Sequence, residues 1–473
     1  MIIRRIVALV SLLAVCVCAA SVTRYVDASN SDDPLEDGSA ANPFDRIQEA
    51  ILASAGGDVV LVLPGTYFEN IDFSGRDIRV ESRDGPDVTT IDGGAIWSVV
   101  TIASGETRAA TLQGFSITNG YGGGTGTFDL GGGIRIFDAA PTIVGNRIFN
   151  NVASFGGGID CDESDPLIIA NEIFSNTVND SHLRHLSGDG GAISVFNSSA
   201  EIYANRIHHN HARRRGGGIV SQDSDIRTHE MNVVIANNLI YANTVQDQDG
   251  GGVCILDRGT VTLRGNTIAA NDSAIGGGLL LRGEDLVVDF ANTIVWNNTA
   301  SVASQGLIDA FTTVDLSYSL IPGGLAGLDI SQQAIVTVGG GILAADPDFA
   351  DEDGLDFRVH ACSLAVNAGR PDYTPQPGET DVAGGPRIVA GRVDIGAFEA
   401  AITDANGNDI ADACECPADL DADGAVGLPD LATLLANFGT PVGATPQMGD
   451  LDADTDVDVQ DLSLLLAAFG QSC

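Results

Sequence analysis

The residues with the clearest chemical pattern lie near the end of the 473-residue chain, where aspartates alternate with small residues. The segment DLDADGAVGLPD places side-chain oxygens at positions 1, 3, 5 and 12 of an EF-hand-type loop, a glycine at position 6 and a backbone carbonyl at position 7. Hard oxygen ligands at alternate positions of a tight loop are the ligands that Ca²⁺ prefers. We therefore expect one ion to be held by Asp419, Asp421, Asp423, Ala425 and Asp430.

The same pattern recurs 31 residues later as DLDADTDVDVQD. The second set of expected ligands is Asp450, Asp452, Asp454, the carbonyl of Asp456, and Asp461. Here Thr455 replaces the loop glycine, and both loops end in Asp rather than Glu, which puts the affinity of the second site in question. Upstream, DANGNDIAD resembles a thrombospondin type 3 calcium repeat, which implies a third calcium segment through Asp404, Asn406, Asn408 and Asp412. A solvated linker would have a similar sequence.

Two further polar clusters lie in the middle of the chain. One is GGGIDCDESDP, where paired carboxylates suit either glycoside hydrolysis or a surface calcium clip. The other is NRIHHNHARRRGGG, the only cationic cluster in the chain, whose guanidinium groups suit a uronate or sulfate. Polar residues at such a turn can also be simply solvated. The candidate ligand-binding residues are Asp160, Asp162, Asp165, His209, Arg213, Arg214 and Arg215. No residue is assigned as catalytic, because no Ser-His-Asp or metal-histidine pattern stands out.

Charge and composition exclude several classes of function. The chain has 23 basic against 64 acidic residues, a net charge of −41, so a nucleic acid would be repelled. All 23 basic residues are arginine, which excludes a Schiff-base or P-loop lysine. Glycine accounts for 58 residues, and hydrophobic residues make up 44% of the chain. This composition predicts an ordered chain with many tight turns.

An internal repeat decides the fold class. The pattern N-x-[IL]-x-x-N begins at Asn146, Asn171, Asn205, Asn238, Asn266 and Asn292. A glycine marker of the GGGI type runs in phase with it from Gly131, Gly156, Gly190, Gly216, Gly250 and Gly276. Between the markers lie short alternating strands and no helical periodicity. Leucine-rich repeats share the period and the asparagine, but their fixed leucines are missing.

A coil of about 25 residues cannot bury its own apolar face, so we expect the coils to stack as parallel strands. The sequence therefore predicts an all-β right-handed parallel β-helix solenoid with a small α-helical calcium-binding C-terminal module. Asparagines at one level should hydrogen-bond along the stack, and the glycines should form corners with positive φ. The longer spacings place insertions at 179–188, 222–231 and 244–249.

Before the repeats, DRIQEAILASAGGD predicts a short helix that plugs the first coil, with Ile47 and Ile51 on one face. Together with YVDASN and PGTYFEN, this stretch resembles the N-terminal cap of secreted pectate-lyase-like β-helix proteins. The GGGI and I-x-x-N markers resemble the repeats of polymorphic outer-membrane proteins. Residues 346–400, with DPDF, CSLAVNAG and GGPRIVAGRVDIGAFE, resemble a choice-of-anchor closing segment, which implies a last coil plus an anchor.

The duplicated loop followed by one helix, LPDLATLLANFG and then LSLLLAAFG, strongly resembles a type I dockerin. This resemblance implies calcium as cofactor and a cohesin-type protein as partner. The recognition positions of the two copies differ, Leu428-Pro429 against Val459-Gln460, so symmetric dual binding is not assured.

The first twenty residues, with two arginines, an apolar run and small residues before Ser21, have the pattern of a signal peptide. Arg4-Arg5 lacks the rest of a twin-arginine signal, and Cys16 and Cys18 each follow valine, which makes a poor lipobox. An exported protein permits disulfides, and we expect Cys416 to pair with Cys473. Cys161, Cys254 and Cys362 are expected to be buried small hydrophobes.

The expected organisation is a signal peptide (1–20), a cap (21–57), the β-helix (58–345), a closing coil (346–400), a calcium-binding linker (401–416) and a dockerin-like module (417–473). No transmembrane segment is expected in the mature chain, which we place outside the cell or on its surface. The expected function is binding or display associated with carbohydrate. The alternative is a polysaccharide lyase or glycoside hydrolase on the same scaffold, since fold alone does not confer activity.

Overall fold

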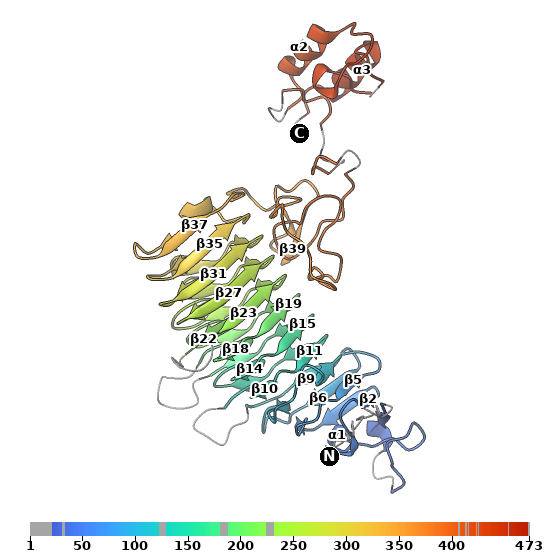
Figure 1. Ribbon diagram of the computed structural model, residues 1–473, viewed down its shortest axis with the longest axis vertical. Helices are drawn as coiled ribbons and strands as arrows, with labels where there is room; N and C mark the ends of the chain where they lie inside the picture. Colours follow the sequence, from blue (N-terminus) through green and yellow to red (C-terminus); the bar gives the residue numbers. More distant parts are fainter. Residues whose placement is uncertain are drawn as a thin grey trace, which may run out of the picture.

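The computed structural model describes residues 21–30, 34–122, 129–179, 188–223, 231–404, 407–411, 414, 416–421, 423, 425–452 and 454–471. The expected signal peptide lies outside this range. Figure 1 shows a long stack of coils, a closing segment against its C-terminal half, and a small helical module beyond it. No helix in the described part of the chain has the length and apolar character needed to cross a membrane.

Each coil contributes one strand to each of up to four parallel sheets. A representative coil runs through β11 (Thr142–Val144), β12 (Arg147–Phe149), β13 (Val152–Ala153) and β14 (Ile159–Asp162). Every strand pairs in parallel with its counterpart in the next coil, as β11 does with β15 and β14 with β18. The predicted fold class is confirmed: the chain forms a parallel β-helix.

The twelve-stranded sheet of the described residues consists of β1 (Thr23–Val26), β2 (Val59–Val62), β5 (Arg79–Ser82), β8 (Thr111–Gln113), β11, β15 (Leu167–Ile169), β19 (Glu201–Tyr203), β23 (Asn232–Ala236), β27 (Gly259–Arg264), β31 (Leu286–Ala291), β35 (Thr313–Ser317) and β37 (Ile335–Val338). The solenoid starts within the segment expected to be a separate cap, because β1 already pairs with β2.

The ten-stranded sheet consists of β4 (Ile71–Asp72), β7 (Val100–Ile102), β10 (Ile134–Phe137), β14, β18 (Ile193–Phe196), β22 (Ile219–Gln222), β26 (Val253–Leu256), β30 (Leu279–Arg282), β34 (Gly306–Ile308) and β36 (Asp329–Ile330). The nine-stranded sheet consists of β3 (Gly65–Phe68), β6 (Thr89–Asp92), β9 (Ser116–Thr118), β12, β16 (Glu172–Phe174), β20 (Arg206–His208), β24 (Leu239–Tyr241), β28 (Thr267–Ala269) and β32 (Ile294–Trp296). A six-stranded sheet of β13, β17 (Thr177–Val178), β21 (His211–Ala212), β25 (Thr244–Val245), β29 (Asp272–Ile275) and β33 (Thr299–Val302) completes the coils.

Inward-facing aliphatic side chains fill the solenoid as one continuous core. At its N-terminal end, α1 (Ile47–Ala53) packs against β1, β2 and β4. Ile47, Ala50 and Ile51 are fully buried there. The predicted helix and its buried face are therefore confirmed.

Two asparagine ladders run inside the stack. The first links Asn146, Asn171, Asn205, Asn238 and Asn266 through side-chain amide bonds of 3.0–3.1 Å. The second links Asn151, Asn176, Asn210, Asn243, Asn271 and Asn298 at 2.9–3.0 Å. Each side chain also donates to a backbone carbonyl, so these buried amides are satisfied.

The sixth sequence match is one residue out of register. Thr267 pairs with Ile294, so the structural equivalent of Asn266 is Thr293 rather than Asn292. Asn292 lies outside the ladder and accepts a hydrogen bond from the backbone N–H of Arg370 at 2.8 Å.

The glycine markers form the predicted corners. The first glycine of each marker has positive φ, for example 58° at Gly131 and 61° at Gly216. The second glycine permits close stacking of coils, since a Cβ added at Gly132 would lie 2.4 Å from the carbonyl oxygen of Gly157. Of the expected insertions, most of 179–188 and 222–231 lies outside the described residues.

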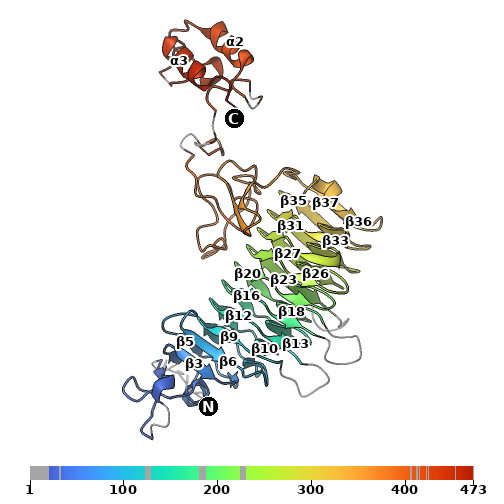
Figure 2. The same ribbon diagram turned by 180° about the vertical axis from the view of Figure 1, so that it is seen from behind.

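The closing segment does not add the expected last coil. It contains an antiparallel pair, β38 (Phe349–Asp351) and β39 (Asp356–Val359), and otherwise runs along the outside of the solenoid (Figures 1 and 2). Its side chains Phe357, Ile395 and Phe398 cover outward-facing apolar residues of the nine-stranded sheet, including Leu239 and Ile294. Without the closing segment these outward-facing apolar side chains would be exposed to water. Their burial is favourable, which explains why the closing segment packs against the side of the solenoid.

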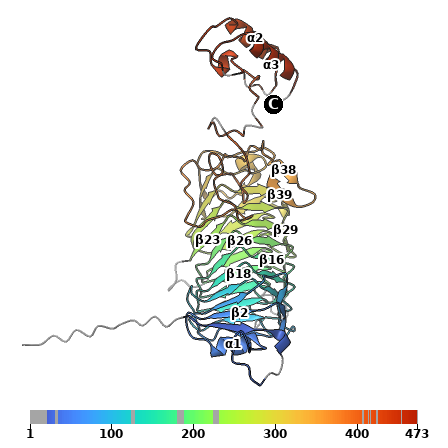
Figure 3. The same ribbon diagram turned by 90° about the vertical axis from the view of Figure 1, so that its right-hand side faces the viewer.

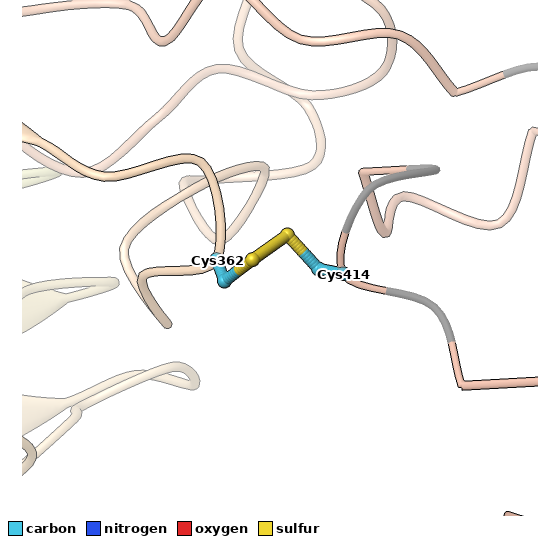
Figure 4. The surroundings of a disulfide bond; sticks show 2 residues. All are labelled: Cys362 and Cys414. Atoms are coloured by element: carbon cyan, nitrogen blue, oxygen red, sulfur yellow. A yellow bond between two sulfur atoms is a disulfide. The ribbon is translucent and has the colours of Figure 1, made fainter. Parts of the chain in front are cut away.

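The cysteines follow the predictions in part. Cys161 and Cys254 are buried and unpaired, as expected. Cys362 instead forms a disulfide with Cys414 (Figure 4), which joins the closing segment to the linker. Pairing across 52 residues carries no local sequence signal, so spacing alone could not reveal it. Cys416 is also disulfide-bonded, while its expected partner Cys473 lies outside the described residues.

The C-terminal module contains α2 (Leu428–Asn437) and α3 (Val459–Ala468) around its own small core (Figure 3). The two copies exchange backbone hydrogen bonds, from Val426 N–H to Gln471 and from Gly439 N–H to Val457. Both predicted helices are present, and each begins within the last residues of its acidic loop, so that Asp430 and Asp461 lie in the first turns.

Candidate functional site

The outer face of the ten-stranded sheet carries a second layer. The residues that precede the glycine corners form isolated parallel bridges with one another, and we call them the corner row: Leu130, Phe155, Asp189, Arg215, Asp249 and Ile275. The left-handed glycines turn this row back toward the outward residues of the following strands, so that Gly156 lies against Asp160. The outward positions in register are Arg135, Asp160, Ser194, Val220, Cys254 and Leu280.

A cavity of about 430 Å³ lies where these two rows meet. Its lining includes Asp160 and Asp162 from β14, Asp189 from the corner row, and Arg214 and Arg215 from the next corner. The structure thus brings together the acidic and the cationic clusters, which lie some fifty residues apart in the sequence. Phe155, Ser194, Phe196 and Gln222 also line the cavity.

The cavity has unusual electrostatics because its carboxyl groups are poorly solvated. Desolvation raises the pKa of Asp160 to about 7, with a further contribution from Asp162, against a hydrogen bond from Ser194. Burial also raises the pKa of Asp189 and Asp162. The Arg214 guanidinium lies 3.9 Å from Asp189. A neutral carboxylic acid at pH 7 donates a hydrogen bond, and a guanidinium binds anions.

The remaining candidates lie elsewhere. Asp165 is exposed and accepts a hydrogen bond from the Ser199 N–H in the next coil. Arg213 faces outward in an ion pair with Asp247 at 3.1 Å. His209 lies on the nine-stranded side, with its Nδ1 2.9 Å from that of His208. These three residues do not line the cavity.

Asp189, Ser194 and Gln222 are cavity residues that sequence reasoning missed. A positional signal was present. Asp189 occupies the same place before the glycine marker as Arg215, and Ser194 the same outward place as Asp160. Aligning the repeats on the glycines would have grouped them.

A second cavity of about 510 Å³ follows along the same sheet. It shares Arg215 and Gln222 with the first and extends to Arg282 of β30. Arg282 forms ion pairs with Asp249 at 2.9 Å and Asp309 at 2.7 Å. The surface formed by the two cavities therefore extends from β14 to β30, a length of about 19 Å at the usual spacing between strands.

The first acidic loop brings three carboxylates together. Oxygens of Asp419, Asp421 and Asp430 lie within 4.8 Å of one another. Asp430 is buried at the start of α2 and accepts from Gly427 N–H at 2.6 Å, which fixes its position. Asp423 accepts from Ala425 N–H and is not part of this group.

The second loop has the same arrangement of Asp450, Asp452 and Asp461. Oδ1 of Asp450, which is 4% exposed, has no hydrogen-bond partner, as expected of an oxygen that ligates a cation. Thr455 adopts the left-handed conformation, φ 76°, that the loop glycine normally provides. Oxygen donors of this number and spacing fit Ca²⁺.

The linker candidate is only partly described, because Asn406 and Asp412 lie outside the described residues. Asp404 accepts hydrogen bonds from the N–H groups of Gly407, Asn408 and Asp409 at 2.7–3.2 Å. Its carboxylate thus closes a turn.

Comparison with known proteins agrees with this geometry. Residues 98–300 match the family model of the right-handed β-helix region. The fold is a right-handed parallel β-helix. A search of curated proteins finds no match.

Solved structures with similar folds include pectate lyase Pel9A, at 16% identity and a TM-score of 0.43, covering 80% of this chain and 97% of that one. A rhamnogalacturonan lyase has 13% identity and a TM-score of 0.36, covering 70% and 91%. A pectin methylesterase from carrot has 13% identity and a TM-score of 0.36, covering 68% of this chain and 89% of that one. These similarities concern the fold alone.

Proposed function

We propose that this β-helix protein is exported and binds a polysaccharide segment along its ten-stranded sheet. The observation that carries this proposal is the pair of neighbouring cavities that share Arg215 and Gln222. Their combined length suits an extended polymer rather than a single small molecule. Arg214 and Arg215 would bind sugar carboxylates, while the protonated form of Asp160 donates to a hydroxyl or carboxylate.

We further propose that the C-terminal module holds two calcium ions and docks to a cohesin-type partner, so that the β-helix is displayed on a scaffold or surface. Asp419, Asp421 and Asp430 would hold one ion, and Asp450, Asp452 and Asp461 the other. Calcium would neutralise the crowded carboxylates: desolvation and then neighbouring carboxylates raise the pKa of Asp452. The backbone bonds between the two copies support a module that folds as one unit.

Calcium and partner binding are tested together on the full chain. Calorimetry should show two calcium sites, with one lost in Asp419→Ala and the other in Asp450→Ala. A panel of cohesin domains should retain the protein in calcium and release it in chelator. Absence of calcium binding would refute the docking proposal.

Polysaccharide binding is tested by affinity electrophoresis in gels that contain polygalacturonate, with neutral polysaccharides for comparison. Arg214→Ala should weaken retention, whereas Arg213→Ala, which removes an adjacent arginine outside the cavity, should leave it unchanged. Equal retention of both variants and of the wild type would refute the cavity as the binding site.

One observation favours a second function, polysaccharide cleavage. A carboxyl with a pKa near 7 suits a general acid. Asp162 is the next outward residue of β14, with its Cα about 7 Å away by strand geometry, so the two carboxyl groups project from the same face. A glycosidase uses two such carboxyl groups on either side of the scissile bond. Release of reducing or unsaturated ends by the wild type, lost in Asp160→Asn and Asp162→Asn, would establish cleavage. Binding without product would leave display as the function.

A further inference from the structure

The closing segment overhangs the twelve-stranded sheet and encloses a third cavity, of about 570 Å³. Its floor is formed by outward residues of β15, β19, β23 and β27, which stack in register. Its wall is the stretch 376–380 of the closing segment. Figure 2 shows that segment beside the C-terminal half of the stack. The cavity lies on a different sheet from the two cavities described above.

The floor combines apolar and aromatic surface. Leu167, Ile169 and Val234 line it together with Tyr203, whose side chain is half-buried. Among the described residues, the Tyr203 hydroxyl makes no hydrogen bond. Burial raises the pKa of Tyr203, so the phenol stays neutral and remains a donor. An apolar aromatic body with a free hydroxyl suits a ligand with both apolar and hydroxyl faces.

The rim is polar and already ordered. Glu379 accepts from Asn237 Nδ2 at 2.8 Å and from Tyr373 Oη at 2.5 Å. The Arg264 guanidinium lies 5.3 Å from the centre of the Tyr373 ring and 3.7 Å from Glu379. Arg264 Nε and Oδ1 of Asn237, a residue that is 1% exposed, are buried without a partner. A bound ligand or water would complete these groups.

The charges of the rim balance. Arg264 faces Glu379, and Arg108 pairs with Glu201 at 2.7 Å. With each arginine matched by a carboxylate, the cavity offers no surplus charge for an ionic ligand. This distinguishes it from the first cavity, whose lining holds both Arg214 and Arg215 together with Asp160, a carboxyl whose pKa is raised to about 7 by burial.

We propose that this cavity is a second saccharide site that binds a neutral oligosaccharide, with Tyr203 as the stacking residue. An apolar floor ringed by oriented, charge-balanced hydrogen-bonding groups matches the alternating C–H faces and hydroxyl edges of a sugar ring. The inference rests on the proposed function for the class of ligand. Its residues are separate from those of the first cavity, so the two sites succeed or fail independently.

The test is calorimetry of the full chain in calcium with cellohexaose, xylohexaose and mannohexaose as probes. At least one should bind with 1:1 stoichiometry. Tyr203→Ala should weaken that binding about tenfold or more, and Tyr203→Phe, which keeps the ring, only about threefold. Tyr121→Ala, which removes an exposed tyrosine elsewhere on the solenoid, is the matched control and should bind as the wild type does.

Arg214→Ala separates this site from the first cavity. It should leave hexasaccharide binding intact while weakening retention by polygalacturonate. If no neutral hexasaccharide binds, or if Tyr203→Ala binds as tightly as the wild type, the second site is refuted whatever polygalacturonate does. If hexasaccharide binding falls in Arg214→Ala and not in Tyr203→Ala, the neutral sugar occupies the first cavity and the inference is wrong.

Discussion

Replacing Asp160 by asparagine should change the pH dependence of stability in a predictable direction. The folded-state pKa of this carboxyl is about 7 against an ordinary value of 3.8, chiefly because burial disfavours the ionised form. The fold therefore favours the protonated carboxyl. Its stabilising effect is fully present below pH 3.8 and is lost as the pH rises through 7.

The magnitude follows from the size of the pKa shift. A displacement of about three pH units corresponds to about 4 kcal/mol of unfolding free energy lost between pH 4 and pH 8. Asparagine has the shape of the protonated carboxyl and cannot ionise. Asp160→Asn should therefore be close to the wild type at pH 4 and more stable than it by about 4 kcal/mol at pH 8.

Urea unfolding followed by far-ultraviolet circular dichroism, in calcium at both pH values, measures this difference. Asp138→Asn is the matched control, because Asp138 is exposed after the neighbouring strand β10. If Asp160→Asn retained the full pH dependence of the wild type, Asp160 would be ionised in the fold, and its assignment as a neutral donor in the cavity would be wrong.

Three further substitutions test other parts of the chain. Asn205→Ala removes a side chain that makes four hydrogen bonds in the first ladder. Thermal unfolding should show a free energy of unfolding lower by about 3 kcal/mol. Asn232→Ala, at an exposed position, is the control and should leave the stability unchanged. Thr455→Gly should raise the calcium affinity of the second loop about fivefold in calorimetry, because glycine relieves roughly 1 kcal/mol of steric crowding at this positive φ. An unchanged affinity would contradict this reasoning. The double substitution Cys362→Ser and Cys414→Ser should destabilise the closing segment by about 4 kcal/mol in the chain-entropy model. The expected result is faster proteolysis within residues 401–416. Equal proteolysis rates in the double variant and the wild type would contradict this prediction.

The solenoid could be predicted because its determinants are local and repeated. The corner glycine and the paired asparagines perform the same task in successive coils of the central part of the stack, so they recur in the sequence. The sixth repeat shows the limit. Ile294 has the motif position of an inward residue, yet Val295 faces the core and Ile294 faces outward. Its partner is the closing segment, a contact between distant parts of the chain that the repeat pattern does not contain.

The candidate site was predictable in its residue types and not in its assembly. Asp160 and Arg214 stood out as members of charged clusters, but their meeting depends on the corner row folding back over the sheet. Asp189 was missed because it is an isolated aspartate in the sequence. The acidic loops were predictable because all their ligands lie within one short segment.

The sideways path of the closing segment determines how the molecule would carry mechanical force. A pull on the C-terminal module reaches the closing segment near the Cys362–Cys414 disulfide. That segment contacts several coils at once, through Asn237, Thr267 and Asn292. The load is therefore shared by hydrogen bonds in different coils that must break together. Attachment at the end of the last coil would instead let the stack unwind one coil at a time.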